Sequence, residues 1–108
     1  MDFREAGTKV GVGWYTLLNT LYRAKPAGCE IMAVSRVDGR LHITAIGITP
    51  MFRDNIRLAE NASARTCEDC GNSGGHRREM QGGEIVTLCD ACEVRRTRKF
   101  REFPDSSP

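Results

Sequence analysis

The sequence of 108 residues contains no hydrophobic run that approaches the roughly 20 residues of a membrane-spanning helix. It also lacks the apolar stretch of a secretory signal, because its first residues, MDFREAGTKVGVG, are polar and rich in glycine. Neither sign of charge dominates, since 16 lysines and arginines accompany 14 aspartates and glutamates. We therefore expect a cytoplasmic protein with no membrane partner, and the overall charge does not by itself identify a nucleic-acid-binding protein.

Histidine is scarce, with only His42 and His76 in the chain. No combination of nucleophile, base and orienting group is visible in the sequence, and no pair of carboxylates is placed for acid–base chemistry. The sequence therefore predicts that the protein is not an enzyme.

Residues 14–66 predict a helix, a β-hairpin and a second helix, preceded by a flexible lead-in over residues 1–13, where glycines disfavour regular structure. The first helix covers residues 14–24, because large apolar side chains recur there at the spacing of one helical face. The hairpin covers residues 29–48, and the second helix covers residues 49–66.

The predicted hairpin turns at Asp38-Gly39, a preferred pair for a two-residue type I′ turn. Counting outward from this turn gives three pairs that share a mostly apolar face: Arg36 with Leu41, Val34 with Ile43, and Met32 with Ala45. In the second helix, Thr49 is the expected N-cap and Pro50 the first helical residue. The side chains expected on its buried face are Phe52, Ile56, Ala59 and Ser63.

Four of the five cysteines form two pairs with the spacing C-x2-C-x18-C-x2-C: Cys67, Cys70, Cys89 and Cys92. Two cysteines separated by two residues can direct both sulfurs at one ion about 2.3 Å away, and a second pair completes a tetrahedron. This spacing predicts one zinc ion, although iron can occupy the same set of donors. A redox pair is disfavoured, because neither pair lies near a βαβ pattern.

The segment between the cysteine pairs, HRREMQGGEIVTL, predicts a second hairpin that turns at Gly82-Gly83. Cys92 would then lie in the first turn of a helix. A cysteine turn, a hairpin and a helix in this order form the treble-clef arrangement. The predicted fold class is therefore α+β, with a treble-clef-like zinc module and basic helix over residues 67–103 joined to the front half, and a frayed tail over residues 104–108.

The predicted zinc is structural, because a catalytic zinc keeps one position open for water and four sulfurs leave none. Nucleases of the HNH type also frame their catalytic insert with cysteine pairs, but they need further histidine ligands. Here the insert contains only His76, and no histidine follows Cys92. Few large apolar side chains lie within this half, so we expect it to unfold without the metal.

The chain also resembles small, mostly uncharacterised zinc-binding proteins of bacteriophages and prophages. The similar pieces are ENASARTCEDCG, HRRE and TLCDAC, together with GWYTLLNTLY upstream. The resemblance implies a phage or prophage origin and a bacterial host cytoplasm. It implies no established activity.

Two kinds of partner remain open. The segment VRRTRKFR, residues 94–101, carries five cations and no anion, which is typical of phosphate contacts, although several acidic residues lie nearby. The alternative is inhibition of a host protein, for example as an anti-CRISPR or another anti-defence protein. The predicted nucleic-acid or partner contacts are His76, Arg77, Arg78, Arg95, Arg96, Arg98, Lys99, Phe100 and Arg101.

Overall fold

The computed structural model describes the backbone of residues 1–105 and the side chains of residues 1–97. The elements, in chain order, are α1 (Phe3–Gly7), the 3-10 helix η1 (Val12–Trp14), α2 (Tyr15–Ala24), β1 (Glu30–Val37), β2 (Arg40–Ile46), α3 (Pro50–Ser63), β3 (His76–Glu79), β4 (Ile85–Leu88) and α4 (Asp90–Asp105). The strands form two separate antiparallel hairpins, β1-β2 and β3-β4, so the α+β class is confirmed. None of the described helices is long and apolar enough to cross a membrane.

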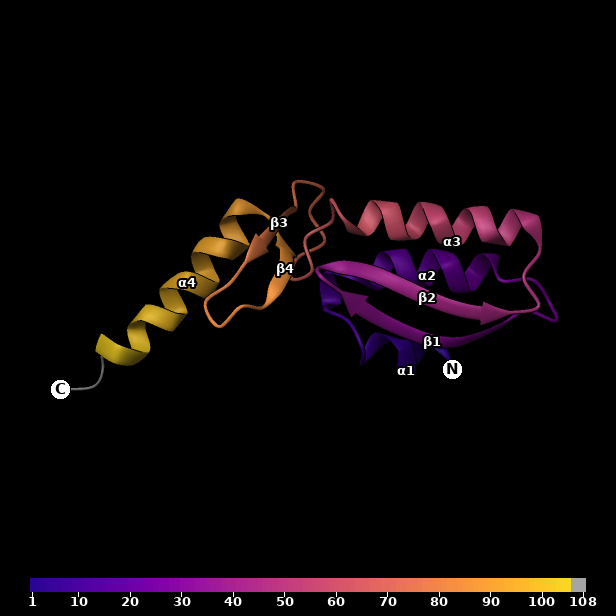
Figure 1. Ribbon diagram of the computed structural model, residues 1–108, viewed down its shortest axis with the longest axis horizontal. Coiled ribbons are helices and arrows are strands. Elements are labelled where there is room, and N and C mark those ends of the chain that lie inside the picture. Colours follow the sequence, from indigo (N-terminus) through magenta and orange to yellow (C-terminus); the bar gives the residue numbers. More distant parts are fainter. Residues whose placement is uncertain (106–108) are drawn as a thin grey trace.

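The molecule is elongated, with extents of 58 × 23 × 20 Å, and α4 projects from one end (Figure 1). At the other end, α2 and α3 lie side by side against the β1-β2 hairpin (Figure 1). The largest buried side chains of this front half are Trp14, Leu18, Leu21, Ile31, Leu41 and Phe52. The predicted buried face of α3 is confirmed, and Thr49 accepts the N-cap hydrogen bond from the Phe52 amide at 3.1 Å.

The β1-β2 turn is the predicted one, because Asp38 and Gly39 both have positive φ, at 51° and 75°. Two of the three predicted pairs are also confirmed, namely Arg36 with Leu41 and Val34 with Ile43. The third is wrong: a bulge between Ile31 and Ala33 places Ile31 opposite Ala45. The bulge buries the branched side chain of Ile31 in the core and leaves Met32 half exposed.

The outer edge of β2 is covered by side chains of α3. Ser63 Oγ accepts a hydrogen bond from the Leu41 amide at 2.8 Å, and Glu60 Oε2 accepts one from the Ile43 amide at 2.9 Å. These bonds satisfy backbone amides that would otherwise lie open at a sheet edge.

The expectation of a flexible lead-in over residues 1–13 is wrong for the residues that form α1. Asp2 caps this helix by accepting a hydrogen bond from the Glu5 amide, and Ala6 is fully buried. The Met1 ammonium also donates to the Ile31 carbonyl of β1 at 3.0 Å. Gly13 lies where two segments of backbone come close together. A Cβ on Gly13 would lie 2.0 Å from the Cys67 carbonyl oxygen, so a larger residue would not fit there.

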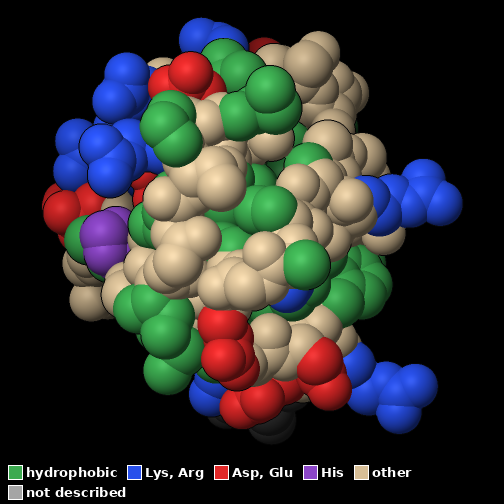
Figure 2. Space-filling model, turned by 90° about the vertical axis from the view of Figure 1, so that its right-hand side faces the viewer, with side chains coloured by type: hydrophobic (Ala, Val, Ile, Leu, Met, Phe, Trp, Pro, Cys, Tyr) green, Lys and Arg blue, Asp and Glu red, His purple; other side chains and the backbone are tan. Residues whose placement is uncertain are grey.

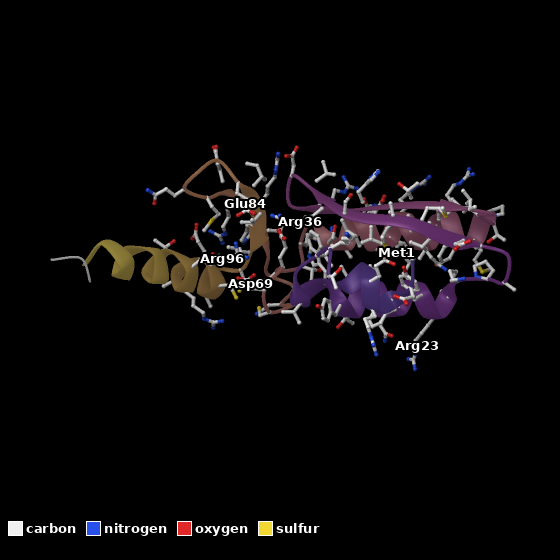
Figure 3. The ribbon with its side chains drawn as sticks, turned by 90° about the horizontal axis from the view of Figure 1, so that it is seen from below. Met1, Arg23, Arg36, Asp69, Glu84 and Arg96 are labelled. Atoms are coloured by element: carbon white, nitrogen blue, oxygen red, sulfur yellow. The ribbon has the colours of Figure 1, made fainter. Side chains whose placement is uncertain are left out.

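The front half and the cysteine half meet at the buried carboxylate of Glu68, whose side chain is only 3% exposed. Its Oε1 accepts a hydrogen bond from Arg36 Nε of β1, and its Oε2 accepts one from the Thr87 amide of β4, both at 2.7 Å. Its main chain also links both halves, because its carbonyl accepts from the Gly13 amide and its amide donates to the Thr87 carbonyl. Arg36 reaches on toward Glu84, and these two side chains lie at the junction in Figure 3.

A further hydrogen bond crosses the same junction, and another lies beside it at the end of the front half. Thr87 Oγ1 donates to the Gly39 carbonyl at the tip of the β1-β2 turn, at 2.5 Å. Trp14 Nε1 donates to the Thr66 carbonyl at 2.8 Å, just before the first cysteine. The cysteine half therefore packs directly against the front half. At the other end of the chain, α4 extends to Asp105 and so includes the start of the expected tail, while residues 106–108 lie outside the described residues.

We predict that Glu68→Gln lowers the free energy of unfolding by about 3–5 kcal/mol, because it removes the charged partner of Arg36 and turns a donor toward the Thr87 amide. The matched control is Glu84→Gln, which removes the other carboxylate partner of Arg36 from a side chain that is 55% exposed. This control should cost at most about 1 kcal/mol. Urea unfolding of the metal-loaded proteins measures both values, and equal losses would contradict the role of Glu68.

Candidate metal centre

The four cysteines of the two C-x2-C pairs converge on one point, with their sulfurs all within 4.8 Å of one another. The sulfurs of Cys70 and Cys89 are 3.7 Å apart. Two ligands of a tetrahedral ion with bonds of about 2.3 Å are separated by about 3.8 Å. The donor set therefore fits one metal ion, and the cluster predicted from the spacing is present. Cys29 is buried in the core of the front half, outside the cluster.

The first pair is held by a tight turn that follows α3. The Gly71 amide donates to the Cys67 carbonyl at 3.0 Å, and the Cys67 amide donates to the Asn72 carbonyl at 2.9 Å. Gly71 has a φ of +81°, a conformation that favours glycine, so the chain can reverse directly beneath the sulfurs. The second pair comes from the end of β4, where Cys89 lies, and from the first turn of α4, where Cys92 lies.

The surroundings of the sulfurs are unequal, because Cys67, Cys89 and Cys92 are buried whereas Cys70 is exposed. Burial acts to raise the pKa of Cys67, but hydrogen bonds from backbone amides, the largest from Cys89, outweigh it and lower this pKa to about 7. Burial, together with the neighbouring thiols, raises the pKa of Cys92.

For Cys70, the Asn72 amide lowers the pKa, but the thiols of Cys67 and Cys89, together with partial loss of water around this otherwise exposed residue, outweigh it, so this pKa is raised as well. Four thiolates in such close contact repel one another and need a cation between them. The chemistry of the donors thus points to a bound metal ion.

Two arginines predicted as nucleic-acid contacts instead brace the metal centre. Arg96 of α4 donates two hydrogen bonds to the Asp69 carboxylate, at 2.8 and 2.6 Å, and the two side chains meet at the base of α4 in Figure 3. Arg78 of β3 donates to Glu93 at 2.7 Å and to Asp90 at 2.6 Å, both in the first turn of α4. Their guanidinium groups are paired with carboxylates, and contact of these two arginines with a nucleic acid stays a prediction.

The other predicted contacts differ in their positions. His76 and Arg77 on β3 and Arg95 on α4 are exposed. Arg77 lies 4.0 Å from the Asp38 carboxylate of the β1-β2 turn, but both side chains are largely exposed, so this pair leaves most of its charge accessible. The side chains of four predicted contacts lie outside those that the structure describes: Arg98, Lys99, Phe100 and Arg101.

The sequence analysis assigned no role to Glu68 and Asp69, whose carboxylates bind Arg36, the Thr87 amide and Arg96. The sequence carried no signal for these contacts, because the partners Arg36 and Arg96 lie 32 and 27 residues away along the chain. Asp90 and Glu93 did carry a signal, since acidic residues favour the first turn of a helix.

Comparisons of the chain with protein-family models, with curated proteins and with solved structures found no match. The resemblance to phage and prophage zinc-binding proteins therefore stays a prediction. What the protein does has to be inferred from its own residues.

We predict that Cys67→Ser abolishes stoichiometric metal binding and unfolds the cysteine half, since a structural metal in a small module contributes on the order of 10–16 kcal/mol. Cys29→Ala is the matched control, because it removes a buried sulfur outside the cluster. It should keep one metal ion per chain and cost only packing energy, about 1–2 kcal/mol. Elemental analysis and thermal unfolding distinguish the two variants, and a Cys67→Ser protein with full metal content would refute the site.

Metal affinity should fall steeply as the pH is lowered. The raised pKa values of Cys70 and Cys92 mean that both thiols hold protons in the metal-free protein at neutral pH, and these protons must leave when the metal binds. Lower pH therefore favours the metal-free form. These two protons alone should lower the apparent affinity on the order of 100-fold between about pH 7 and pH 6, and protonation of Cys67, whose pKa is about 7, makes the drop larger. Competition with a chromophoric chelator measures this change, and an unchanged affinity would contradict the thiol donor set.

Proposed function

We propose that the chain is a non-enzymatic nucleic-acid-binding module stabilised by one structural zinc ion. Zinc suits the donor set, because it accepts four thiolates in a tetrahedron without a redox change. Cys67, Cys70, Cys89 and Cys92 would hold the ion, and they leave no position for a reactive water. Bound zinc supplies positive charge and a cross-link, so its role is to hold the cysteine turn, the β3-β4 hairpin and the start of α4 together in a treble-clef-like unit.

The observation that supports nucleic acid as partner is the position of α4. This helix of 16 residues begins at the metal centre and projects past the rest of the molecule (Figure 1). Its segment 94–101 carries five cations and no anion. An α-helix about 10–12 Å wide fits the major groove of DNA, and arginines along it can contact phosphates.

The ion pairs around the metal centre support the same proposal by setting the direction of α4. Arg96 and Arg78 attach its first turns to the cysteine turn and to β3, at 2.6–2.8 Å from the carboxylates that they bind. Arg95, next to Arg96, is exposed. A helix fixed at its base can present basic residues without the entropy cost of ordering a free arm.

A protein partner is the second candidate, favoured by an apolar groove of about 280 Å³ between α2 and α3. Leu58 at this groove is 66% exposed and adds its apolar side chain to the accessible wall of the groove. The alternative of a phage inhibitor that binds a host protein would use such a surface. The residues lining the groove are Leu17, Thr20, Leu21, Ala24, Asn55, Leu58, Ala59 and Ala62.

We predict that the zinc-loaded protein binds DNA or RNA at low salt, with an affinity that falls steeply as salt rises. Arg95→Ala combined with Arg98→Ala should lower the slope of log affinity against log salt by about 1–2, because each lost phosphate contact removes about 0.7–0.9. Arg4→Ala combined with Arg23→Ala removes the same charge from α1 and α2 and should leave the slope nearly unchanged. Fluorescence anisotropy measures these slopes, and no binding to either nucleic acid at low salt would refute the proposal.

The variants Arg96→Ala and Arg95→Ala distinguish an arginine that stabilises the cysteine half from one that is proposed to bind nucleic acid. Because Arg96 is paired with Asp69, its loss should lower the stability of the cysteine half by about 1–3 kcal/mol. Arg95→Ala should lower nucleic-acid affinity without a change in thermal stability. Paired melting and binding measurements check this, and the reverse assignment would contradict the structure.

A further inference from the structure

A second group of cations lies on the front half, where α3 meets β2. Arg53, Arg57 and Glu60 are spaced four and three residues apart, so they share one side of α3. The Glu60 carboxylate accepts the Ile43 amide of β2 at 2.9 Å, which shows that this side of α3 faces the strand edge. Arg53 and Arg57 are both exposed, and they therefore lie along this edge.

β2 contributes two more basic side chains to the same line. Arg40 Nε donates to the Glu60 carbonyl at 3.3 Å, and its guanidinium also donates to the Asn61 side chain. His42 Nδ1 lies 3.9 Å from Glu60 Oε2, and 60% of its side chain is exposed. The four basic residues, together called the α3–β2 ridge below, are Arg40, His42, Arg53 and Arg57.

The ridge keeps a positive charge. The partners of the Arg40 guanidinium, a carbonyl and an amide oxygen, are neutral. Within the described part of the chain, neither Arg53 nor Arg57 forms an ion pair. Glu60 is only 22% exposed and uses one oxygen on the Ile43 amide. Asp54 lies about 120° around the helix from Glu60, and three residues before Arg57, so it borders the ridge on the side away from Glu60.

Figure 2 shows the end of the molecule opposite α4. Basic side chains and histidine gather at its upper left, toward α3 and the β1-β2 hairpin, with some acidic side chains beside them, and further acidic side chains lie along its lower edge (Figure 2). The ridge thus brings four basic side chains together around the Glu60 carboxylate, on a chain whose net charge is only +2.

The ridge has the character of a phosphate-binding surface more than of a protein interface. Arginines held on a helix and a strand can bind phosphate oxygens through two parallel hydrogen bonds. A protein interface needs exposed apolar anchors at its centre. The large apolar side chains of residues 40–44 and 52–57 are all buried: Leu41, Ile43, Phe52 and Ile56.

We propose that the α3–β2 ridge binds the phosphate backbone of a nucleic acid, as a surface separate from α4. Like the function proposed above, this proposal has a nucleic acid as the partner, but it concerns a different surface of the protein. It does not need α4 to take part, because all of its residues lie on the front half.

The test compares double variants of the zinc-loaded full chain. Arg53→Ala with Arg57→Ala should fold normally, because both positions are exposed and alanine is the best helix former. Binding to a fluorescein-labelled DNA duplex of 20 base pairs, and to a single-stranded RNA of 20 nucleotides, is followed by anisotropy over a salt series. At low salt we expect about tenfold weaker binding than wild type, and a salt slope lower by about 2. Arg4→Ala with Arg23→Ala is the control of equal charge and should change affinity less than about twofold.

The outcomes decide between the surfaces. If the ridge variant binds as tightly as the control, the ridge proposal is overturned, while a loss in the Arg95→Ala and Arg98→Ala variant would still support α4. If only the ridge variant loses affinity, the ridge is supported and the role of α4 fails. Equal losses in the ridge and control variants would show an effect of net charge alone and overturn the ridge. Polyglutamate that binds through Arg53 and Arg57 more tightly than the oligonucleotides would assign the ridge to an acidic protein and also overturn the proposal.

Discussion

The arrangement of the two halves depends on three consecutive residues, each of which makes a different attachment. Cys67 supplies a sulfur to the metal cluster, Glu68 binds Arg36 and the Thr87 amide, and Asp69 binds Arg96 at the base of α4. A turn this short leaves the three side chains little independent movement. Because a domain of this size is stable by only about 5–15 kcal/mol, a metal worth on the order of 10–16 kcal/mol decides whether the second half is folded at all. Glu68 then decides where that half sits against the front half.

The arginines of this chain divide into those that hold the structure and those that remain on the surface. Arg36, Arg78 and Arg96 are each within 2.7 Å of a carboxylate, and their side chains are no more than about one third exposed. Their positive charges are paired with carboxylates inside the structure. These three arginines, out of 16 lysines and arginines in the chain, therefore add little to the positive charge of the surface. Among the described side chains, exposed cations lie on β3 and at the start of α4 at one end and along the α3–β2 ridge at the other, and further exposed cations, such as Arg4 and Arg23, lie singly on the front half. On a molecule 58 Å long, such a division allows contacts with a polyanion at well-separated points.

A metal ion held by these four sulfurs would have a structural role. It would lie at the start of α4, which projects from the molecule. A tetrahedron of thiolates has no free position for substrate, so a zinc ion bound here would fix the start of α4. The four sulfurs differ in burial, and the exposed Cys70 is the one that solvent reaches most easily. The apolar groove between α2 and α3 is independent of the metal centre and offers a different chemistry from the basic surfaces. Both kinds of surface are therefore built on one small scaffold.

Features that depend on residues close together in the sequence could be predicted from the sequence alone. Helical spacing located α2 and the buried face of α3, and Asp38-Gly39 located the type I′ turn. The C-x2-C pairs identified the four cysteines whose sulfurs come together. Each of these features depends on neighbours within a few residues. The tertiary structure alone decided the bulge that buries Ile31 in place of Met32, and the packing of α1, whose N-terminal ammonium binds a carbonyl 30 residues away. It also decided that Arg36 binds Glu68, 32 residues apart, and that Arg96 binds Asp69, 27 residues apart. The sequence does not show whether a charged side chain contacts water or a buried carboxylate. Only the folded chain brings such distant partners together.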